Sequence, residues 1–377
     1  MDALMLPLNW QRVRLGDICE IVKGQQINKI SLNNTDKYPV INGGIDFLGY
    51  TNKFNVSKNT IAISEGGTCG YVRFMTSDFW SGGHNYSLQK INNKVNNLCL
   101  YHILKSYEKD IMKLGVGSGL KNIQLKTLKD FEILLPPLNE QIAIANILSD
   151  VDRYLYSLDA LILKKESVKK ALSFELLSQR KRLKGFNQNW QRVRLGDVGK
   201  PCMCKRVMKH QTTRYGEIPF YKIGTFGNTA DAFISKKLFL EYKTKYSFPK
   251  KGDILISASG TIGRAVIYDG KPAYFQDSNI VWIDNDETLV KNDFLFYAYS
   301  NIKWSTEHTT ILRLYNDNFR NTLIPLPPLN EQIAIANILS ALDNEIISLK
   351  NKKRQFDNIK KALNHDLMSA KIRVLKK

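Results

Sequence analysis

Two stretches of the chain carry apolar residues at alternating steps of three and four, a spacing that places them along one face of a helix. The first series comprises Leu148, Val151, Leu155, Leu158 and Ile162, continued by Val168, Leu172 and Leu176. The second comprises Leu339, Leu342, Ile346, Leu349, Phe356, Leu363, Leu367, Ala370 and Val374. This pattern predicts coiled-coil helices of about 45 residues, roughly 65 Å long. Lys165 stands where the second series has Phe356, so we expect an imperfect seam there.

A pair of prolines precedes each predicted helix, at Pro136-Pro137 and Pro327-Pro328. Proline disfavours helical geometry in the residue before it, and an asparagine side chain can accept hydrogen bonds from the first free amides of a helix. We therefore expect Asn139 and Asn330 to cap the first turns.

The segments before these prolines contain short apolar runs broken by Gly, Asn and Asp. The predicted strands include Thr60–Ser64, Gly70–Phe74, Asp253–Ser257, Arg264–Tyr268 and Asn279–Ile283. Helical patterns at Leu98–Lys109 and Asp293–Ile302 interrupt them. Each half of the chain is therefore predicted to contain a compact α+β domain.

Two strings recur without change. LPPLNEQIAIANILS occurs at Leu135–Ser149 and at Leu326–Ser340, and NWQRVRLGD occurs at Asn9–Asp17 and at Asn189–Asp197. The segments between the strings mostly differ. A recent duplication alone could leave identical patches, but chance would not spare equivalent positions in both halves. We therefore expect the two halves to do the same thing at their edges and different things in their middles.

The simplest partner for one predicted helix is the other. The chain would leave the first domain along one helix, form the second domain, and return along the other helix. The predicted fold is thus two β-rich mixed α+β domains, 1–137 and 185–328, separated by a pair of long antiparallel helices, 138–184 and 329–377, that form a coiled coil with internal pseudo-twofold symmetry. Pairing of each helix with a second protein molecule stays open.

The chain of 377 residues has 55 Lys and Arg against 35 Asp and Glu, a formal net charge of +20. This excess favours a polyanionic partner, although a generally basic proteome would give the same balance. The basic residues are spread along the sequence, which favours a folded surface over a basic tail.

The sequence also favours a reduced cytoplasmic protein. It shows no secretory signal and no apolar run near the roughly 20 residues of a membrane span. The five cysteines form no regular framework. Cys202 and Cys204 lack a second ligand pair at a suitable spacing, so we expect no metal site.

Two variable domains, each closed by LPPLNEQ and a long helix, resemble the specificity subunit of Type I restriction-modification enzymes, over essentially the whole chain. The resemblance implies two target-recognition domains that each read one half of a split double-stranded DNA sequence, with the helices setting the gap. It implies no catalysis by this chain, and two methyltransferase subunits as partners, joined in the full assembly by translocating nuclease subunits. S-adenosylmethionine, ATP and magnesium would belong to those partners, and no cofactor to this chain.

Candidate DNA-contacting residues come from a patch shared by both halves, Ser-x-x-Gly-Thr-x-Gly. Its members are Ser64, Gly67, Thr68 and Gly70 in the first copy and Ser257, Gly260, Thr261 and Gly263 in the second. Small residues let a backbone approach a ligand closely, and hydroxyls can bond phosphate. A structural β-turn without a ligand explains the pattern equally well.

Further candidates are side chains that can bond base edges. The loop at Gly115–Leu125, of a kind similar to loops in this family, offers Ser118, Gly119, Lys121 and Asn122, and the second copy offers Arg313, Tyr315 and Asn316. The remaining candidates are Arg73, His84, Asn85, Lys222 and Arg264. The repeated helix starts predict partner contacts by Asn139, Glu140, Gln141, Asn330, Glu331 and Gln332.

Two other functions compete with this interpretation. Asp231, Glu241 and Lys243 follow the loose order of a metal-dependent nuclease, without a counterpart in the first half. A stand-alone DNA-binding regulator would share the charge and the two readers, but it leaves the identical helix starts unexplained. A nucleotide-binding glycine loop should open a helix and be followed by an acidic residue some 20 positions on. A β-like stretch and Asn139 follow the loop at Gly115–Gly119, so we do not expect it to bind a dinucleotide or S-adenosylmethionine.

Overall fold

The computed structural model describes residues 9–304 and 313–374. These residues form two compact units. Unit 1 combines the described residues up to Ala160 with those from Lys350 onward, and unit 2 is Leu161–Leu349. No helix in the described residues is both long and apolar enough to cross a membrane.

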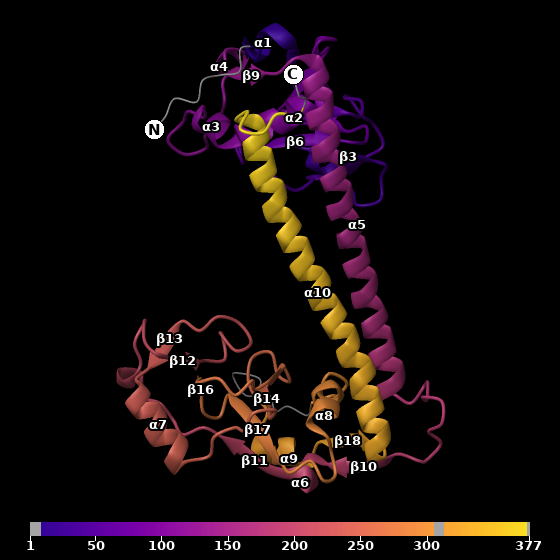
Figure 1. Ribbon diagram of the computed structural model, residues 1–377, viewed down its shortest axis with the longest axis vertical. Helices are drawn as coiled ribbons and strands as arrows, with labels where there is room; N and C mark the ends of the chain where they lie inside the picture. The colour runs from indigo at the N-terminus through magenta and orange to yellow at the C-terminus, as the bar shows by residue number, and fades with distance from the viewer. Residues whose placement is uncertain (1–8, 305–312, 375–377) are drawn as a thin grey trace. The chain divides into compact units, whose positions relative to one another are not determined.

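Unit 1 contains a four-stranded sheet, a three-stranded sheet and a two-stranded ladder (Figure 1). The four-stranded sheet has the order β2 (Glu20–Lys23), β8 (Asn85–Gln89), β5 (Thr60–Ser64), β6 (Val72–Met75). The three-stranded sheet is β4 (Gly49–Thr51), β3 (Tyr38–Ile41), β7 (Trp80–Ser81), and β1 (Gln11–Arg14) pairs with β9 (Glu132–Leu135). The helices are α1 (Leu15–Ile18), α2 (Asn97–Ser106), α3 (Glu108–Lys113) and α4 (Leu125–Lys129).

Unit 2 repeats this topology. Its four-stranded sheet is β11 (Gly199–Met203), β17 (Ile280–Asn285), β14 (Ile254–Ser257), β15 (Ala265–Ile267). The three-stranded sheet is β13 (Ala232–Ile234), β12 (Ile218–Tyr221), β16 (Tyr274–Phe275), and β10 (Gln191–Arg194) pairs with β18 (Leu323–Leu326). The helices are α6 (Leu195–Val198), α7 (Lys236–Lys245), α8 (Asn292–Tyr299) and α9 (Asn316–Asn321), and α7 lies beside β12, β13 and β16 in Figure 1. The internal repeat is therefore confirmed in the fold.

One inner strand of each four-stranded sheet, β5 or β14, separates two cores. In β5, Ile61 and Ile63 enter the core that contains the helices, whereas Ala62 enters a small core with Phe79 on the other face. In β14 the residues Ile254 and Ile256 alternate with Leu255 in the same way. This alternation follows from the period of two along a strand. It buries both faces of β5 and β14, so only the loops at their ends reach the surface.

The two long helices are α5 (Leu138–Leu177) and α10 (Leu329–Met368), each of 40 residues. In unit 1, Lys353 pairs with Asp159 at 2.6 Å, and the rings of Tyr154 and Phe356 are 4.6 Å apart. In unit 2, Lys165 Nζ lies 2.8 Å from Glu345 Oε1, and Lys169 Nζ lies 2.5 Å from Asp343 Oδ1. Partner numbers rise in one helix as they fall in the other, so the predicted antiparallel pairing is confirmed within each unit; Figure 1 shows α5 and α10 side by side.

At Lys165, where an imperfect apolar seam was expected, an ion pair with Glu345 takes the place of an apolar contact. Two details of the helix predictions are corrected. Val168 is 44% exposed and does not belong to the buried face. The helices begin at Leu138 and Leu329, one residue before the asparagines, so Asn139 and Asn330 do not cap them. The carbonyl of Pro137 accepts the first helical hydrogen bond, from Gln141 N at 2.9 Å.

The hydroxyl of Tyr299 gives the first prediction. It is buried in unit 2 without a hydrogen-bond partner among the described residues, and burial raises the pKa of this phenol far above its usual range. An unsatisfied buried hydroxyl costs about 1–3 kcal/mol. We expect Tyr299→Phe to raise the free energy of unfolding by about 1 kcal/mol, measured as an increased urea midpoint. The matched control is Tyr297→Phe, because the Tyr297 hydroxyl donates to Asp343 at 2.8 Å. That change should lower the midpoint, and a fall for both variants would contradict the assignment.

Candidate nucleic-acid interface

In unit 1, three segments far apart in the sequence meet at the end of β5. Glu65 N donates to His84 O at 2.9 Å, Ile123 N donates to Glu65 O at 2.9 Å, and Thr68 N donates to Gly43 O at 2.7 Å. The turn needs glycine at Gly67, where φ is +69° and a Cβ would lie 2.8 Å from Gly43 O. We call the region around Glu65, His84 and Asn122 the loop cluster of unit 1.

Unit 2 repeats two of these three backbone hydrogen bonds, and they form the frame that the units share. Ala258 N donates to Asn279 O at 2.8 Å, and Leu314 N donates to Ala258 O at 2.8 Å. Glu65 therefore corresponds to Ala258, and His84 corresponds to Asn279. The amides of Ile123 and Leu314 make equivalent hydrogen bonds in the two units. Asn122 and Arg313, the residues before them, therefore correspond to each other. The loop cluster of unit 2 is the region around Ala258, Asn279 and Arg313. Equivalent backbone hydrogen bonds thus position different side chains in the two units.

The loop cluster of unit 1 centres on a buried carboxylate. Glu65 is 8% exposed, and its Oε1 lies 2.6 Å from Lys23 Nζ. Its Oε2 accepts no hydrogen bond from the described part of the chain and lies 3.6 Å from His84 Nδ1. Burial, followed by the Glu65 charge, raises the pKa of the Tyr86 phenol to about 12. Tyr86 is therefore a neutral donor, and its hydroxyl bonds Ile123 O at 3.0 Å.

The loop cluster of unit 2 has a neutral centre. Asn279 Oδ1 accepts from Ser259 Oγ at 2.8 Å and from Arg313 Nη2 at 3.3 Å. Beside it lies a pocket of about 240 Å³. The pocket is lined by Ile223, Gly224, Phe226, Ser257, Gly260, Thr261 and Arg264. Several predicted residues of this half, Ser257, Thr261 and Arg264, therefore do share one site.

Some predicted contacts are wrong because the side chains are used within the chain. Asn85 is 2% exposed, and its amide donates to Ser81 Oγ at 2.8 Å and to Tyr86 O, so it cannot read a base. Ser64 and Ser257 are 4% and 2% exposed. The Ser257 hydroxyl bonds Thr261 O and accepts from Arg264 N, which fixes the turn instead of reaching a phosphate.

The other predicted residues remain at or near the surface. In unit 1, Thr68 is half-buried, and Gly67, His84, Ser118, Lys121 and Asn122 are exposed. Arg73 packs between the rings of Phe47 and Tyr71, with its guanidinium carbon 5.1 and 5.4 Å from their centroids. In unit 2, Lys222 pairs with Asp231 at 2.8 Å, and Arg264 Nη1 donates to Phe226 O at 2.9 Å.

Sequence reasoning missed Lys23, Glu65, Ser259 and Asn279. Glu65 and Ser259 occupy the variable positions of the Ser-x-x-Gly patch, and the prediction named only its constant residues. A comparison of the two copies offered the signal, since Glu65 aligns with an alanine in the second copy. Lys23 and Asn279 gave no signal, because they reach the site from β2 and from the start of β17 through sheet pairing.

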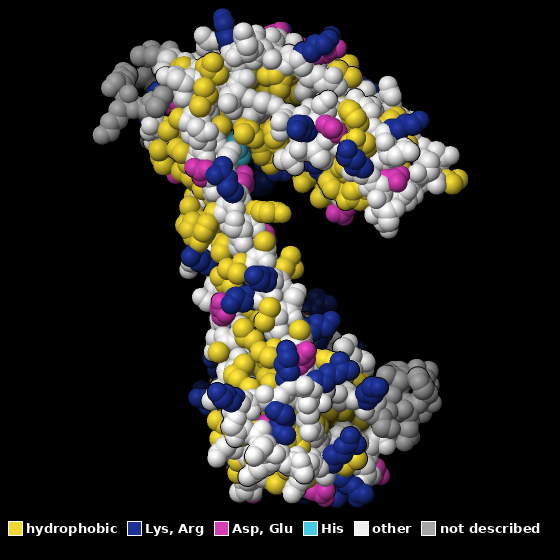
Figure 2. All heavy atoms as spheres, turned by 90° about the vertical axis from the view of Figure 1, so that its right-hand side faces the viewer, with side chains coloured by type: hydrophobic (Ala, Val, Ile, Leu, Met, Phe, Trp, Pro, Cys, Tyr) yellow, Lys and Arg dark blue, Asp and Glu magenta, His cyan; other side chains and the backbone are white. Residues whose placement is uncertain are grey.

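Charge is distributed over both units. Figure 2 shows Lys and Arg side chains spread over each unit on the face it draws, with Asp and Glu among them. This agrees with the basic surface that the composition predicts.

The nuclease pattern is not assembled. Asp231 pairs with Lys222, and Glu241 pairs with Lys245 at 3.0 Å. Among the described residues, no group of three or more His, Cys, Asp or Glu side chains is placed to hold a metal ion. The geometry therefore gives no support to the nuclease hypothesis.

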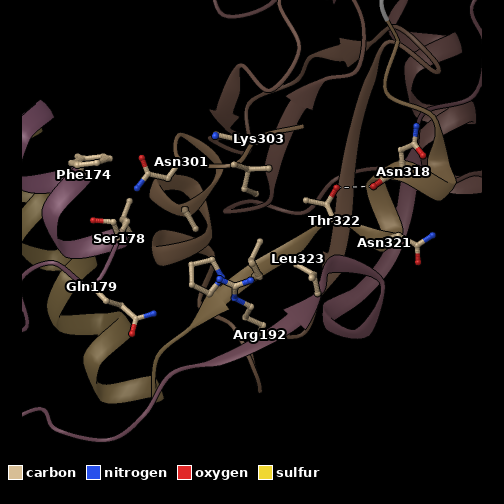
Figure 3. A pocket seen from close by; sticks show the side chains of 15 residues that line it. Phe174, Ser178, Gln179, Arg192, Asn301, Lys303, Asn318, Asn321, Thr322 and Leu323 are labelled. Carbon is tan, nitrogen blue, oxygen red and sulfur yellow. Dashed lines mark hydrogen bonds between the residues drawn. The ribbon is translucent and has the colours of Figure 1, made fainter. Parts of the chain in front are cut away.

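A larger cavity of about 760 Å³ lies in unit 2 between the end of α5, β10 and β18 (Figure 3). The labelled side chains are mostly amides and hydroxyls, with Arg192 and Lys303 as the cations. In unit 1 the matching Arg12 bonds Glu132 at 3.3 Å, but Leu323 replaces that glutamate in unit 2. The described residues that line this cavity include no Asp or Glu, so they offer no general acid or base of that type.

The repeated strings meet at the start of each long helix. In unit 1, Trp10 Nε1 donates to Glu140 Oε2 at 3.2 Å, and Arg373 Nε donates to Glu140 Oε1 at 2.8 Å. In unit 2, Trp190 and Arg182 bond Glu331 at 2.9 and 2.8 Å. Each Trp comes from the opening string and each Glu from the closing string. We call these groups the helix-start junctions.

A glutamine completes each junction. Gln332 Nε2 donates to Pro327 O at 2.9 Å and to Leu289 O at 3.0 Å, and its Oε1 accepts from Lys291 N at 2.8 Å. Gln141 makes the equivalent bonds to Pro136 O, Lys94 O and Asn96 N. Each glutamine therefore ties the helix to the loop that precedes α2 or α8.

The junctions correct the predicted partner contacts. Glu140, Gln141, Glu331 and Gln332 are at most 2% exposed, so a partner cannot touch them directly. Asn139 and Asn330 are exposed. Exposed apolar side chains flank them at matching positions, Leu138 and Ile142 in one copy and Leu329 and Ile333 in the other, each 38–43% exposed.

Comparison with known proteins agrees with this geometry. The family described as "Type I restriction modification DNA specificity domain" matches residues 7–165 and again residues 187–356. A protein of Haemophilus influenzae described as a type I restriction enzyme specificity subunit is 40% identical over 323 residues, covering 80% of this chain and 81% of the relative. The MjaVIII specificity subunit of Methanocaldococcus jannaschii is 27% identical, and the match covers 99% of this chain and 95% of the relative.

A solved structure supports the fold. The Type I restriction-modification S subunit of M. genitalium superposes with a TM-score of 0.68 at 24% identity, over 96% of this chain and 98% of the other. With two matches of the family along the chain and the 40% identical relative, the chain belongs to the family of Type I restriction-modification specificity subunits, and it carries two tandem specificity domains.

The helix-start junction gives a prediction of stability. Glu331→Ala leaves the Trp190 N–H and the Arg182 Nε without their acceptor, while Arg182 Nη2 keeps its bond to Gln188 O. Removal of one partner of a buried pair costs about 3–5 kcal/mol. We expect a loss of about 3 kcal/mol, because Arg182 is partly exposed, measured by urea unfolding. Asn330→Ala, the exposed neighbour, should change stability by less than about 0.5 kcal/mol. If Glu331→Ala lowered the free energy of unfolding no more than Asn330→Ala does, the junction would not be needed for stability.

Proposed function

We propose that this chain is a non-catalytic subunit that selects DNA sequences for a methyltransferase complex. Each loop cluster reads one half of a split target in double-stranded DNA. Two methyltransferase subunits dock beside the helix starts, and nuclease subunits join them in the full assembly. S-adenosylmethionine, ATP and magnesium belong to those partners.

The observation that carries this proposal is one backbone frame with two side-chain sets. Bases differ in the donors and acceptors that they present in the major groove, so two unlike half-sites need unlike side chains. Unit 1 presents Lys23, His84 and Asn122 around a carboxylate. Unit 2 presents Arg313 beside the Asn279 amide, which the buried Ser259 holds in place. A protein that only neutralises phosphate would not need this difference.

The helix starts support the docking part of the proposal. Leu138 and Ile142 recur as Leu329 and Ile333, and all four side chains remain partly exposed beside a buried junction. Two identical surfaces of mixed character can bind two copies of one partner. A solved structure of similar fold, with a TM-score of 0.53 at 16% identity, is described in terms of "complex assembly" of the type I R-M system, which speaks of assembly for that protein.

The proposal is tested by selection from a random duplex library with the complex purified from cells that express the methyltransferase subunit. A motif of two short blocks with an unread gap supports it. A single contiguous motif would overturn it. Cleavage of DNA by the lone chain with magnesium would contradict the non-catalytic role, and DNA selection without any co-purifying methyltransferase would favour a stand-alone regulator.

The docking surfaces give a separate prediction. We expect Ile142→Glu to remove one methyltransferase subunit from the complex, because a charge on an apolar contact must be desolvated. The double variant Ile142→Glu with Ile333→Glu should remove both, as measured by native mass spectrometry. The control is Ile359→Glu, an exposed isoleucine of α10 outside the repeated string. Retention of both partners by the double variant would place the docking surface elsewhere.

The helices give a prediction about the gap. We expect one heptad inserted after Asp159 in α5 and one after Lys352 in α10 to preserve the antiparallel register while adding about 10 Å to the pair. That length corresponds to about three base pairs. Methylation mapping should show a longer gap between unchanged half-sites. Altered half-sites with an unchanged gap would contradict the spacer role.

A further inference from the structure

Each loop cluster contains one acceptor that holds a cationic side chain at the surface. In unit 1, Glu65 holds Lys23 through the 2.6 Å ion pair, and the Lys23 side chain is 52% exposed. In unit 2, Asn279 Oδ1 holds Arg313 at 3.3 Å. Asn279 takes the place of His84, and Arg313 takes the place of Asn122. The two units thus place a cation at the same cluster by different residues.

We propose that Lys23 and Arg313 read bases, each by donating to O6 and N7 of a guanine in the major groove. Glu65 and Asn279 are their positioning residues. This inference rests on the proposed function and deepens it, because it assigns one guanine to each half-site and names the side chain that recognises it.

Unused donors make this recognition possible. An ammonium has three N–H donors and a guanidinium has five. Among the described residues, Lys23 donates one side-chain hydrogen bond, to Glu65 Oε1, so two of its three donors remain. Arg313 gives Nη2 to Asn279 and, within the same part of the chain, retains further donors in a fork that matches the two guanine acceptors. Paired donors on a fixed side chain distinguish guanine from adenine, because adenine presents an amine in place of O6.

The anchors argue for base reading over phosphate contact. A phosphate contact needs a charge near the backbone and tolerates a mobile lysine. Here each cation is fixed by a side chain that is itself held in place. Glu65 is 8% exposed, and its backbone joins the frame at both N and O. Ser259 Oγ also donates to Asn279 Oδ1, at 2.8 Å. Restricted orientation is what discrimination between bases requires.

The unused oxygen of Glu65 adds to the same site. Oε2 is buried and has no hydrogen-bond partner within residues 9–304 and 313–374, and it lies 3.6 Å from Nδ1 of the exposed His84. A small movement of the imidazole on DNA would bring it into hydrogen-bond range of Oε2. The carboxylate would then fix two donors, Lys23 and His84, beside one base pair. Unit 2 has no such carboxylate at the matching Ala258.

The test uses the complex with its methyltransferase subunits and a random duplex library. We expect Arg313→Gln to reduce the preference for guanine over adenine at one position of one half-site by roughly 5- to 150-fold, with the other half-site unchanged. Lys23→Gln should do the same at one position of the other half-site. Glutamine is chosen because its amide bonds adenine in the paired geometry that arginine uses for guanine.

Matched controls separate base reading from charge. Lys58→Gln and Lys271→Gln remove exposed lysines that precede β5 and follow β15, at the strand ends opposite the loop clusters, and they should leave both half-sites unchanged. Should Arg313→Gln abolish binding, Arg313→Lys keeps the charge and should bind with a weakened guanine preference. Asn279→Ala should weaken the guanine preference at the same position as Arg313→Gln. Asn279→Asp, which keeps an acceptor for Arg313, should retain the preference.

The outcomes are distinguishable. A uniform loss of affinity for all sequences with Arg313→Gln would assign the residue to a phosphate and overturn the inference. An unchanged motif in both Arg313→Gln and Lys23→Gln would overturn it as well. A wild-type complex that selects no split motif would reject the proposed function itself, before either variant is considered.

Discussion

The buried Glu–Gln pair at the start of each long helix is the interaction on which the rest of the structure depends. Glu140 and Glu331 bring together a tryptophan from the opening string and an arginine that follows a long helix. The neighbouring glutamines fasten the helix to the reader domain through three bonds each. A buried carboxylate is stable only when it is paired and hydrogen-bonded, and this requirement fixes all three segments at once.

This junction gives a physical reason for the identity of the repeated strings. Their sequences were expected to match because they bind the same partner twice, but their Glu and Gln side chains are consumed within the chain. The docking that we propose is left to the exposed positions, Leu138 and Ile142 with Leu329 and Ile333. The internal junction is one reason for the strings to match, and the proposed docking surface would be a second. The readers differ between these fixed edges, because their loop clusters vary side chains on an unchanged frame.

The sequence predicted the helices, their antiparallel pairing and the repeat, because heptad spacing and long identical strings are strong local signals. It misjudged points where tertiary contacts decide. It did not foresee the ion pair of Lys165 with Glu345, and it took Asn85 for a base reader although sheet pairing buries this side chain. The loop cluster was found only in part. The hydrogen-bond partners of Glu65 and Asn279 lie far from them in the sequence, and periodicity carries no information about contacts between distant positions.

The central claim is that two unlike readers on one frame select two unlike half-sites. Mapping the methylated bases across the genome of a host that carries this chain and the proposed methyltransferase tests it most directly. We expect a split motif with two different short blocks, each containing a guanine, separated by a fixed run of unread bases. A palindromic motif with identical half-sites, or one uninterrupted block, would contradict the claim.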